Sequence, residues 1–216
     1  GYYWATLLAR RRAAALRAAQ GHEPVQILFY HRVADEYPND WTMSTRAFAA
    51  QVDWLRSRFD LVSMAEAQAR IAAGHNRRPT ACITFDDGYA DNMRFSVLLL
   101  AKHKIPFTYF VATDHVLEAR PFPHDVANAR PLAPNTLDQL REIEAAGGEI
   151  GGHTRQHADA GRLSRDELVD EIAGCKQDLE DALGRDVRYF AFPYGLHRNL
   201  TTEAFAIARE AGYAGV

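Results

Sequence analysis

Short apolar runs alternate with amphipathic stretches along almost the whole chain. The first run, 25–30, is followed by a segment in which Phe48, Val52 and Leu55 recur at the spacing of one helical face. Repeated strand–helix units predict a parallel sheet covered by helices, an α/β fold that we expect to close as a barrel. Further strands are expected at 61–62, 81–85, 107–112, 149–152 and 187–192, and further helices at 65–73, 92–103, 135–146, 164–183 and 201–211.

Three parts of the chain depart from this alternation. Residues 113–134 are rich in proline and polar residues and show no period, and a loop of that length in a compact domain is usually functional. Residues 1–24 are Ala-rich and predict a helical extension before a single domain at 25–216. The chain begins without Met and ends on what reads as the start of a strand, so we expect the domain to continue past Val216.

The composition is that of one globular domain and argues against two classes of partner. The 216 residues are 47% hydrophobic and 25% charged, which is enough for a core without disulfides, and Cys82 and Cys175 are expected to be buried thiols. A net charge of −3 provides no field that attracts nucleic acid or an anionic membrane. No apolar segment reaches the roughly 18 residues that span a bilayer, and no complete signal peptide is visible.

Candidate metal ligands follow two of the predicted strands. Asp86 and Asp87 come directly after 81–85, and His153 and His157 follow 149–152. Imidazoles at positions i and i+4 can face one ion, and one carboxylate with two imidazoles leaves coordination positions open for water and substrate. The second carboxylate is then free to act as a base. The combination predicts metal-assisted hydrolysis with one divalent ion; zinc suits these ligands best, and Co²⁺, Ni²⁺ or Fe²⁺ would also suit them.

Each of these motifs also has a plainer interpretation. An Asp-Asp-Gly sequence after a strand can be a turn that caps the next helix. A single histidine is more often a surface residue or a satisfied core residue. The pairing of His153 with His157 after a strand favours the metal interpretation.

Two further strand ends carry candidate chemistry. In 192–195, Pro193 and Gly195 would hold the backbone N–H of Tyr194 outward as an oxyanion donor, although the motif alone can be a simple turn. His31 follows the first strand and could protonate a leaving amine, contact substrate or be a buried residue. In βα barrels the active site lies at the C-terminal ends of the strands, where all these residues are predicted to lie.

Three motifs in this order resemble those of a known family. They are Thr84-Phe85-Asp86-Asp87-Gly88, the pair His153 and His157 with Thr154 between them, and Phe192-Pro193-Tyr194-Gly195. They resemble the leading motifs of the polysaccharide deacetylase (NodB-homology) family, carbohydrate esterase family 4. The sequence YHRV at 30–33 resembles the branch that includes poly-N-acetylglucosamine deacetylases.

The resemblance covers about 25–216 and implies a distorted (β/α)7 TIM-like barrel that removes acetyl groups from sugars. Carried over by position, it implies Asp86 as general base, Tyr194 as the oxyanion-hole donor, and Asp87, His153 and His157 as metal ligands. It also implies an N-acetylated polysaccharide or oligosaccharide as substrate, and action on exported or lipid-linked polymers in the periplasm, outside the cell or facing a membrane. Alternatives are an O-acetyl esterase or another amidase, or a glycan-binding domain that keeps the metal without full activity.

The chain departs from the family pattern at two places. Many members carry Arg two residues before the proline of the third motif, where this chain has Ala191, so the base must be held differently. Members usually supply a late histidine as the general acid, and His197 comes too early for that role. The acid therefore lies beyond Val216, or is His31 or Asp86.

Substrate contacts are the least defined part of the prediction. The irregular segment 113–134 is expected to shape the groove. Within and around it, we expect Tyr89, Pro193 and His124 to contact the substrate.

Overall fold

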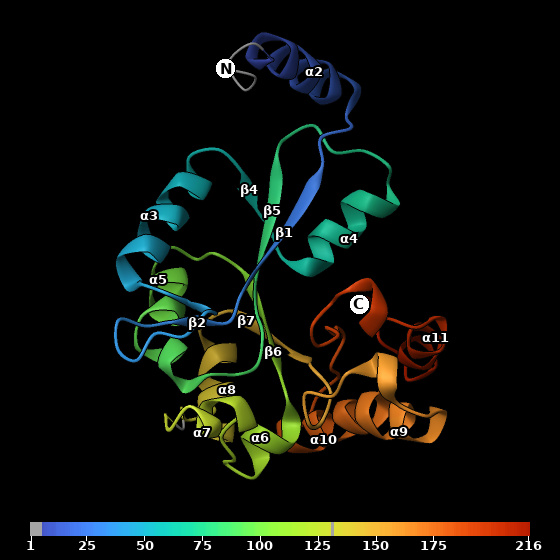
Figure 1. The fold of residues 1–216 in the computed structure, drawn as a ribbon. Coiled ribbons are helices and arrows are strands. Elements are labelled where there is room, and N and C mark those ends of the chain that lie inside the picture. Colours follow the sequence, from blue (N-terminus) through green and yellow to red (C-terminus); the bar gives the residue numbers. More distant parts are fainter. Residues whose placement is uncertain (1–5, 131) are drawn as a thin grey trace.

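The computed structural model describes residues 6–130 and 132–216, and its centre is a parallel sheet (Figure 1). Every strand of this sheet runs in the same direction, as the alternation of strands and helices predicts. The sheet contains β1 (Val25–Tyr30), β4 (Asp60–Leu61), β5 (Thr80–Phe85), β6 (Phe107–Val111) and β7 (Gly148–Gly152). A separate pair, β2 (Arg32–Val33) and β3 (Thr42–Met43), flanks the loop between them.

β5 is the central strand, and every one of its residues is buried. β1 pairs with its whole length, from Val25 opposite Thr80 to Tyr30 opposite Phe85. β4 and β6 therefore share the other side of β5, with β4 at its start and β6 at its end. Motifs that are far apart in the sequence therefore lie at the ends of neighbouring strands, on one edge of the sheet.

Amphipathic helices cover the sheet because each presents an apolar stripe to it. In α3 (Thr45–Arg56) the buried residues are the Phe48, Val52 and Leu55 set that the spacing predicted. Ser and Thr side chains cap several helix N-termini, including Ser44 and Thr136, by accepting a backbone N–H three residues on. The other helices are α2 (Leu7–Gln20), α4 (Met64–Ala72), α5 (Ser96–Lys102), α6 (Thr113–Leu117), α7 (Pro123–Ala127), α8 (Leu137–Ala145), α9 (Arg165–Val169), α10 (Cys175–Leu183) and α11 (Thr202–Glu210).

Three predicted elements differ from the structure. The strand at 187–192 is reduced to single parallel bridges, Tyr189 to Gly215 and Phe190 to Gly152, because the backbone leaves the ladder after each pairing. The helix at 92–103 starts as a 3-10 turn, Ala90–Arg94, before α5. The helix at 164–183 contains a π-helical segment, η3 (Asp170–Gly174), between α9 and α10.

The irregular segment 113–134 contains two short helices, α6 and α7, which the lack of period concealed. Its return path is tied to the residues after β5. Ala90 N donates to Ala133 O at 3.0 Å, and Asn135 N donates to Gly88 O at 2.7 Å. Pro131, inside the predicted loop, lies outside the described residues. The segment is therefore a structured wall beside the Asp86–Asp87 turn.

The α/β fold with a parallel sheet is confirmed, but closure as a barrel is not detected. Within residues 6–130 and 132–216, pairing runs from β1 through β5, β6 and β7 to the bridges at 189–190 and at Gly215. No described hydrogen bond joins Gly215 back to β1. This series of paired strands nevertheless places their C-terminal ends side by side.

The Ala-rich N-terminal segment forms α2, which stands beyond the N-terminal ends of β1 and β5, away from the candidate residues (Figure 1). Gly21 ends the helix with φ of 75°, a left-handed conformation that suits glycine. Residues 1–5 of the predicted extension lie outside the described part of the chain. None of the described helices has the length and apolar character needed to cross a bilayer.

Close packing between β7 and its neighbours predicts that Gly151→Ala destabilises the fold. A Cβ at this position would lie 2.5 Å from the Phe110 ring and 2.9 Å from the Tyr189 carbonyl oxygen. Overpacking of this kind lowers the free energy of unfolding by about 1–3 kcal/mol, which urea denaturation will measure. Gly215→Ala is the matched control, since its nearest atom is at 3.3 Å; an equal loss in both variants would contradict the packing argument.

Candidate metal centre and active site

Asp87, His153 and His157 come together at the C-terminal ends of β5 and β7. Their ligand atoms all lie within 4.8 Å of one another. Asp87 Oδ1 is 3.5 Å from His153 Nε2 and 3.2 Å from His157 Nε2. Two segments distant in sequence thus aim one carboxylate and two imidazoles at a single point, as the sequence predicted.

The protonation pattern of this trio leaves a place for a cation. His153 Nδ1 donates to Ala191 O at 2.8 Å, so the Nε2 of the neutral ring carries a lone pair toward Asp87. Asp87 Oδ1 is buried and has no hydrogen-bond partner. Two acceptors facing each other in a buried site repel unless a proton or a metal ion lies between them. The donor set therefore fits one divalent ion.

The pKa shifts have the same cause. Burial alone would raise the pKa of Asp87, but the adjacent imidazoles of His153 and His157 bring it well below its usual value. Burial alone would lower the pKa of His153, and the neighbouring carboxylates Asp87 and Asp86 raise it instead. Burial lowers the pKa of His157. The pocket thus stabilises positive charge beside a permanently ionised carboxylate.

Backbone strain is concentrated at this centre. Asp87, Thr154, His157 and Tyr194 have φ of 72°, 64°, 57° and 66°. Left-handed conformations are unfavourable for residues with a Cβ, and they persist where the surroundings fix them. Each of these residues either belongs to the trio or flanks it, so the strained backbone sets the direction of the side chains at this centre.

The histidine segment is anchored by the π-helical turn η3. The carboxylate of Glu171, which is buried, accepts from the backbone N–H of Arg155 at 2.9 Å and of Gln156 at 3.0 Å. Arg155 in turn makes a bidentate pair with Asp178, at 2.7 and 2.9 Å. A Cβ at Gly174 would meet the Arg155 guanidinium at 2.5 Å, so any larger residue there would displace the guanidinium from this position. π-turns are frequent at functional sites, and this one supports the loop that carries both imidazoles.

Asp86 lies on the other side of the same turn. Its backbone N–H donates to Tyr30 O at 2.8 Å, and no described residue donates to its half-buried carboxylate. Desolvation raises its pKa, although the nearby imidazoles of His153 and His31 act in the opposite direction. A carboxylate with a raised pKa and a free oxygen has the properties of a proton acceptor. The paired aspartates therefore differ in environment, with Asp87 buried among the imidazoles and Asp86 half-buried beside them.

Tyr194 and Pro193 occupy the tight turn predicted at 192–195. Gly195 N donates to Pro193 O at 2.8 Å, and the backbone N–H of Tyr194 donates to no residue in the described part of the chain. The Tyr194 ring packs edge-on against His157, with ring centroids 5.0 Å apart. Pro193 itself is buried, so its ring shapes the turn and offers no surface to substrate. This corrects the expected direct contact of Pro193.

His31 is half-buried near Asp86, and its ring lies 4.7 Å from that of the exposed Trp41. Asn92 holds the backbone of this residue, since its Nδ2 donates to His31 O at 2.8 Å. The ring is close enough to Asp86 to lower the pKa of that carboxyl. The imidazole is therefore at the site and reachable from solvent, which removes the alternative of a buried structural histidine.

Tyr89 is 1% exposed, so the expected substrate contact of this side chain is wrong. Its hydroxyl donates to Asp125 Oδ2 at 2.9 Å and lies 3.0 Å from His124 Nε2. Tyr89 thus positions α7 relative to the Asp86–Asp87 turn. His124 is half exposed, and its ring stacks near Phe122 with centroids 5.5 Å apart, which leaves it open to a ligand.

Sequence reasoning missed three supporting residues: Arg32, Glu171 and Asp125. Arg32 is 1% exposed and pairs with Asp91 at 2.6 Å. Its position in the YHRV sequence, just after the first predicted strand, was a usable signal. An arginine is seldom fully buried unless it has partners to hold. Glu171 and Asp125 look like ordinary helix-surface residues in the sequence, and only the fold reveals what they hold.

The comparisons with known proteins agree with this geometry. The polysaccharide deacetylase family model matches residues 73–216. YxkH of Bacillus subtilis (strain 168) is 23% identical over 190 residues, and the chitooligosaccharide deacetylase of Bradyrhizobium sp. (strain ANU 289) is 28% identical over 136 residues. These matches cover 87% and 62% of this chain, and the chain spans 61% and 53% of the length of the two relatives.

Solved structures are similar over most of the chain. IcaB from Ammonifex degensii has a TM-score of 0.75 at 27% identity, covering 88% of this chain and 82% of that one. The Streptococcus pyogenes deacetylase PplD, solved in complex with acetate, has a TM-score of 0.73 at 21% identity, covering 88% and 81%, and supports the fold. With a family model that extends from residue 73 to residue 216 and the three motifs gathered at one site, this chain belongs to the polysaccharide deacetylase family.

Proposed function

We propose that this protein is a metal-dependent carbohydrate deacetylase that hydrolyses acetamido groups on an N-acetylated polysaccharide or oligosaccharide. The observation that carries the proposal is the trio of Asp87, His153 and His157 with the free carboxylate of Asp86 beside it. Membership of the family and the named activity of the chitooligosaccharide deacetylase relative support the same reaction.

The trio would hold the metal ion through Asp87 Oδ1 and the Nε2 atoms of His153 and His157. When bound, a divalent cation supplies a Lewis acid that polarises the acetamide carbonyl and lowers the pKa of water. Zinc is the ion that we assign, because a ligand set of two imidazoles and one carboxylate would suit it. The fixed Nδ1–H of His153 and the strained backbone keep these lone pairs aimed at one point.

The remaining steps belong to the side chains around the trio. Asp86 takes a proton from the attacking water as its oxygen bonds to the carbonyl carbon. The backbone N–H of Tyr194 donates to the carbonyl oxygen as negative charge develops there. This hydrogen bond lowers the activation free energy by about 3 kcal/mol. The C–N bond then breaks, and a proton returned to nitrogen releases amine and acetate.

Two described groups are placed to return that proton. Asp86 holds the proton that it has taken from water, and His31, just after the end of β1, is near enough to affect the pKa of that carboxyl. His197 is exposed on the 3-10 turn His197–Asn199, and we do not assign the proton return to it. We assign the proton return to His31 or Asp86 within the described part of the chain.

Metal removal is expected to abolish activity. Dialysis against a chelator should reduce acetate release from N-acetylglucosamine oligomers to background, and one equivalent of Zn²⁺ should restore it. His157→Ala should lose the bound metal, as measured by elemental analysis, because one of three ligands is gone. His75→Ala is the control, since His75 is exposed and outside the site. Full activity in the chelated protein would rule out this chemistry.

Asp86→Asn is expected to remove the proposed base and to leave the three proposed metal ligands unchanged. The rate of acetate release should fall roughly 10²–10⁴-fold, because the amide cannot accept the proton from water. Metal content should match the unmutated protein, since Asp86 is not one of the three ligands. A variant that keeps the full rate, or that loses its metal, would contradict the assignment of Asp86.

Glu171→Ala is expected to weaken metal binding from outside the ligand set. Two backbone N–H groups of the histidine segment would lose their acceptor, and loss of such support weakens metal affinity roughly 10–100-fold. Competition with a zinc chelator of known affinity measures the change. Asp166→Ala, an exposed carboxylate on α9, is the matched control. Equal affinities in the two variants would remove the role of Glu171 as an anchor.

A further inference from the structure

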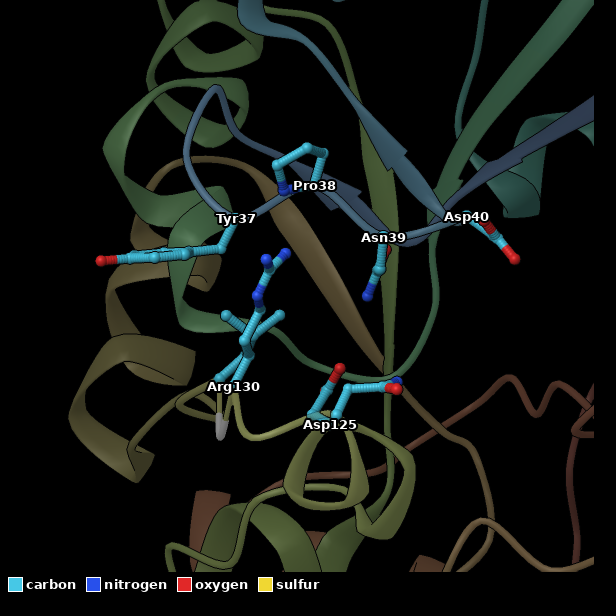
Figure 2. Close-up of a pocket in the computed structure, with 8 residues that line it drawn as sticks. Tyr37, Pro38, Asn39, Asp40, Asp125 and Arg130 are labelled. Carbon is cyan, nitrogen blue, oxygen red and sulfur yellow. The ribbon is translucent and has the colours of Figure 1, made fainter.

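The imidazole of His31 has two aromatic neighbours. The ring of Trp41 lies 4.7 Å from it at an angle of 32°, and the ring of Phe29 lies 5.7 Å from it. Trp41 is the last residue of the loop between β2 and β3, and two other residues of this loop, Tyr37 and Asp40, are labelled in Figure 2. The position of the imidazole therefore depends on how this loop and the backbone of His31 are held.

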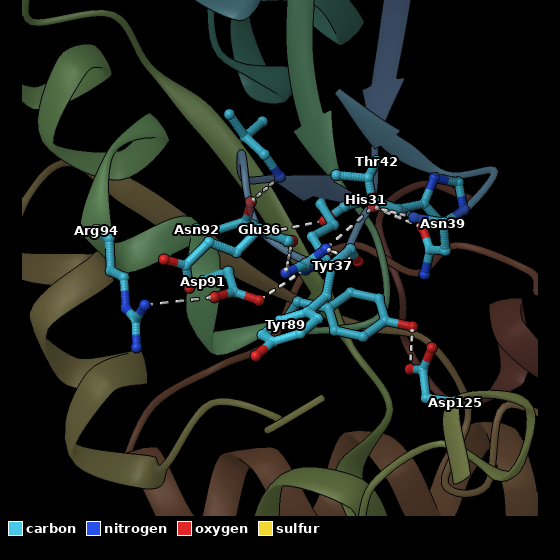
Figure 3. Close-up of polar contacts among 12 residues, drawn as sticks. His31, Glu36, Tyr37, Asn39, Thr42, Tyr89, Asp91, Asn92, Arg94 and Asp125 are labelled. Atoms are coloured by element: carbon cyan, nitrogen blue, oxygen red, sulfur yellow. Dashed lines mark hydrogen bonds and ion pairs between the residues drawn. The ribbon is translucent and has the colours of Figure 1, made fainter. Parts of the chain in front are cut away.

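A buried asparagine holds that backbone. Asn92 is fully buried and lies on the 3-10 turn Ala90–Arg94. Its Nδ2 donates to His31 O at 2.8 Å, and its Oδ1 accepts from Val33 N at 2.9 Å (Figure 3). One side-chain amide therefore bridges the backbone on both sides of Arg32.

The bridge lies where regular strand pairing stops. β1 and β5 pair up to Tyr30 opposite Phe85, and Asp86 N still donates to Tyr30 O at 2.8 Å. The chain then bends at His31 before β2 begins. The C=O of one residue and the N–H two residues further on are the groups that a neighbouring parallel strand would bond. The amide of Asn92 therefore takes the place of a strand at this bend.

The same amide is tied to the turn that carries the aspartates. Asn92 Nδ2 also donates to the hydroxyl of Tyr109 at 3.0 Å, and that hydroxyl donates to Tyr89 O at 2.8 Å. Tyr109 is fully buried in β6, and Tyr89 follows Asp87 by two positions. A buried polar network whose members are bonded to one another is rigid. The backbone at His31 and the backbone after Asp87 are thus fixed to one another.

The residue before Asn92 holds the neighbouring side chain. Asp91 pairs with the buried guanidinium of Arg32 at 2.6 Å. The same guanidinium donates to Glu36 O and Tyr37 O, both at 2.8 Å (Figure 3). Two consecutive residues of the 3-10 turn therefore hold the segment after β1, one through a side chain and one through the backbone.

Proton transfer depends on where this segment places the imidazole. His31 and Asp86 are the residues that directly follow the paired Tyr30 and Phe85. A misplacement of about 1 Å can slow a catalysed reaction about 100-fold. Asn92 is fully buried and does not contact substrate, so any effect that it has on the rate acts through the residues that it holds.

We propose that Asn92 is a positioning residue for proton transfer, because its amide fixes the backbone bend that keeps the imidazole of His31 at the end of β1, next to Asp86. The inference deepens the proposed function and rests on it for the reaction. The bend itself does not depend on the reaction and has its own test.

A double-mutant cycle tests the effect on the reaction. Asn92→Ala should lower kcat for acetate release from N-acetylglucosamine oligomers roughly 10–100-fold and leave KM within about twofold. In a protein that already carries His31→Ala, adding Asn92→Ala should change kcat by no more than about twofold, since no imidazole is left to position. The same fold loss in both backgrounds, or full activity in His31→Ala, would overturn the proposal.

Asn76→Ala is the matched control for stability. Asn76 is also buried, and its Nδ2 donates to a backbone carbonyl, that of Glu23, at 2.9 Å. It precedes β5, at the end of the sheet opposite to the candidate site. Asn76→Ala should lower the urea midpoint as Asn92→Ala does and keep kcat within about twofold of the unmutated value. An equal loss of kcat in both variants would overturn the positioning role.

Two nuclear magnetic resonance measurements test the bend without turnover. Val33 N–H should be protected from exchange with D2O in the unmutated protein and should exchange faster in Asn92→Ala, while the N–H groups of β5 stay protected. The ring current of Trp41 shifts the ring protons of His31, and these shifts should move toward their values in Trp41→Ala when Asn92 is replaced. Asn92→Asp, which keeps the shape but lacks the Nδ2 donor, serves for the ring shifts and for the cycle where Asn92→Ala does not fold.

The outcomes separate this inference from the proposed function. An unprotected Val33 N–H in the unmutated protein, or His31 ring shifts that replacement of Asn92 leaves unchanged, would overturn the inference even where acetate is released. An unmutated protein that releases no acetate would contradict the proposed function instead, and the two resonance measurements would still decide whether Asn92 holds His31.

Discussion

The mutual repulsion of buried lone pairs at one point is the constraint on which the site depends. Asp87 Oδ1 faces two imidazole nitrogens at 3.2 and 3.5 Å without a proton donor of its own. Such an arrangement is unfavourable in a low-dielectric interior unless a cation occupies the centre. The left-handed residues, the Ala191 carbonyl and the Glu171 carboxylate all help to hold this arrangement.

The ordered motifs were predictable from the sequence because each is a local pattern with a known geometric consequence. The buried run at 81–85 predicted the central strand, and a parallel sheet brings the ends of its strands together, which placed Asp87 and His153 side by side. The helical spacing of Phe48, Val52 and Leu55 likewise gave α3. These predictions required only the spacing of apolar residues within a segment and the pairing of neighbouring parallel strands.

The remaining features depend on contacts between distant segments, which no local pattern records. Glu171 lies 16 positions from Arg155, and Asp125 lies 36 positions from Tyr89. Tyr89 was expected to contact the substrate, yet its side chain is buried and Phe122 packs against its ring. The strand at 187–192 had the right composition, but its pairing is limited to single bridges, Tyr189 to Gly215 and Phe190 to Gly152.

The π-helical turn at Asp170–Gly174 has a consequence for how this family member can vary. Such a turn accommodates one residue more than an α-helix of the same length. Deleting one residue there would restore regular helix geometry, keep α9 and α10 in nearly the same phase, and change the direction of the side chains inside the turn. The carboxylate that grips the histidine loop would then swing away from it, so a shorter and more regular helix would be incompatible with this loop.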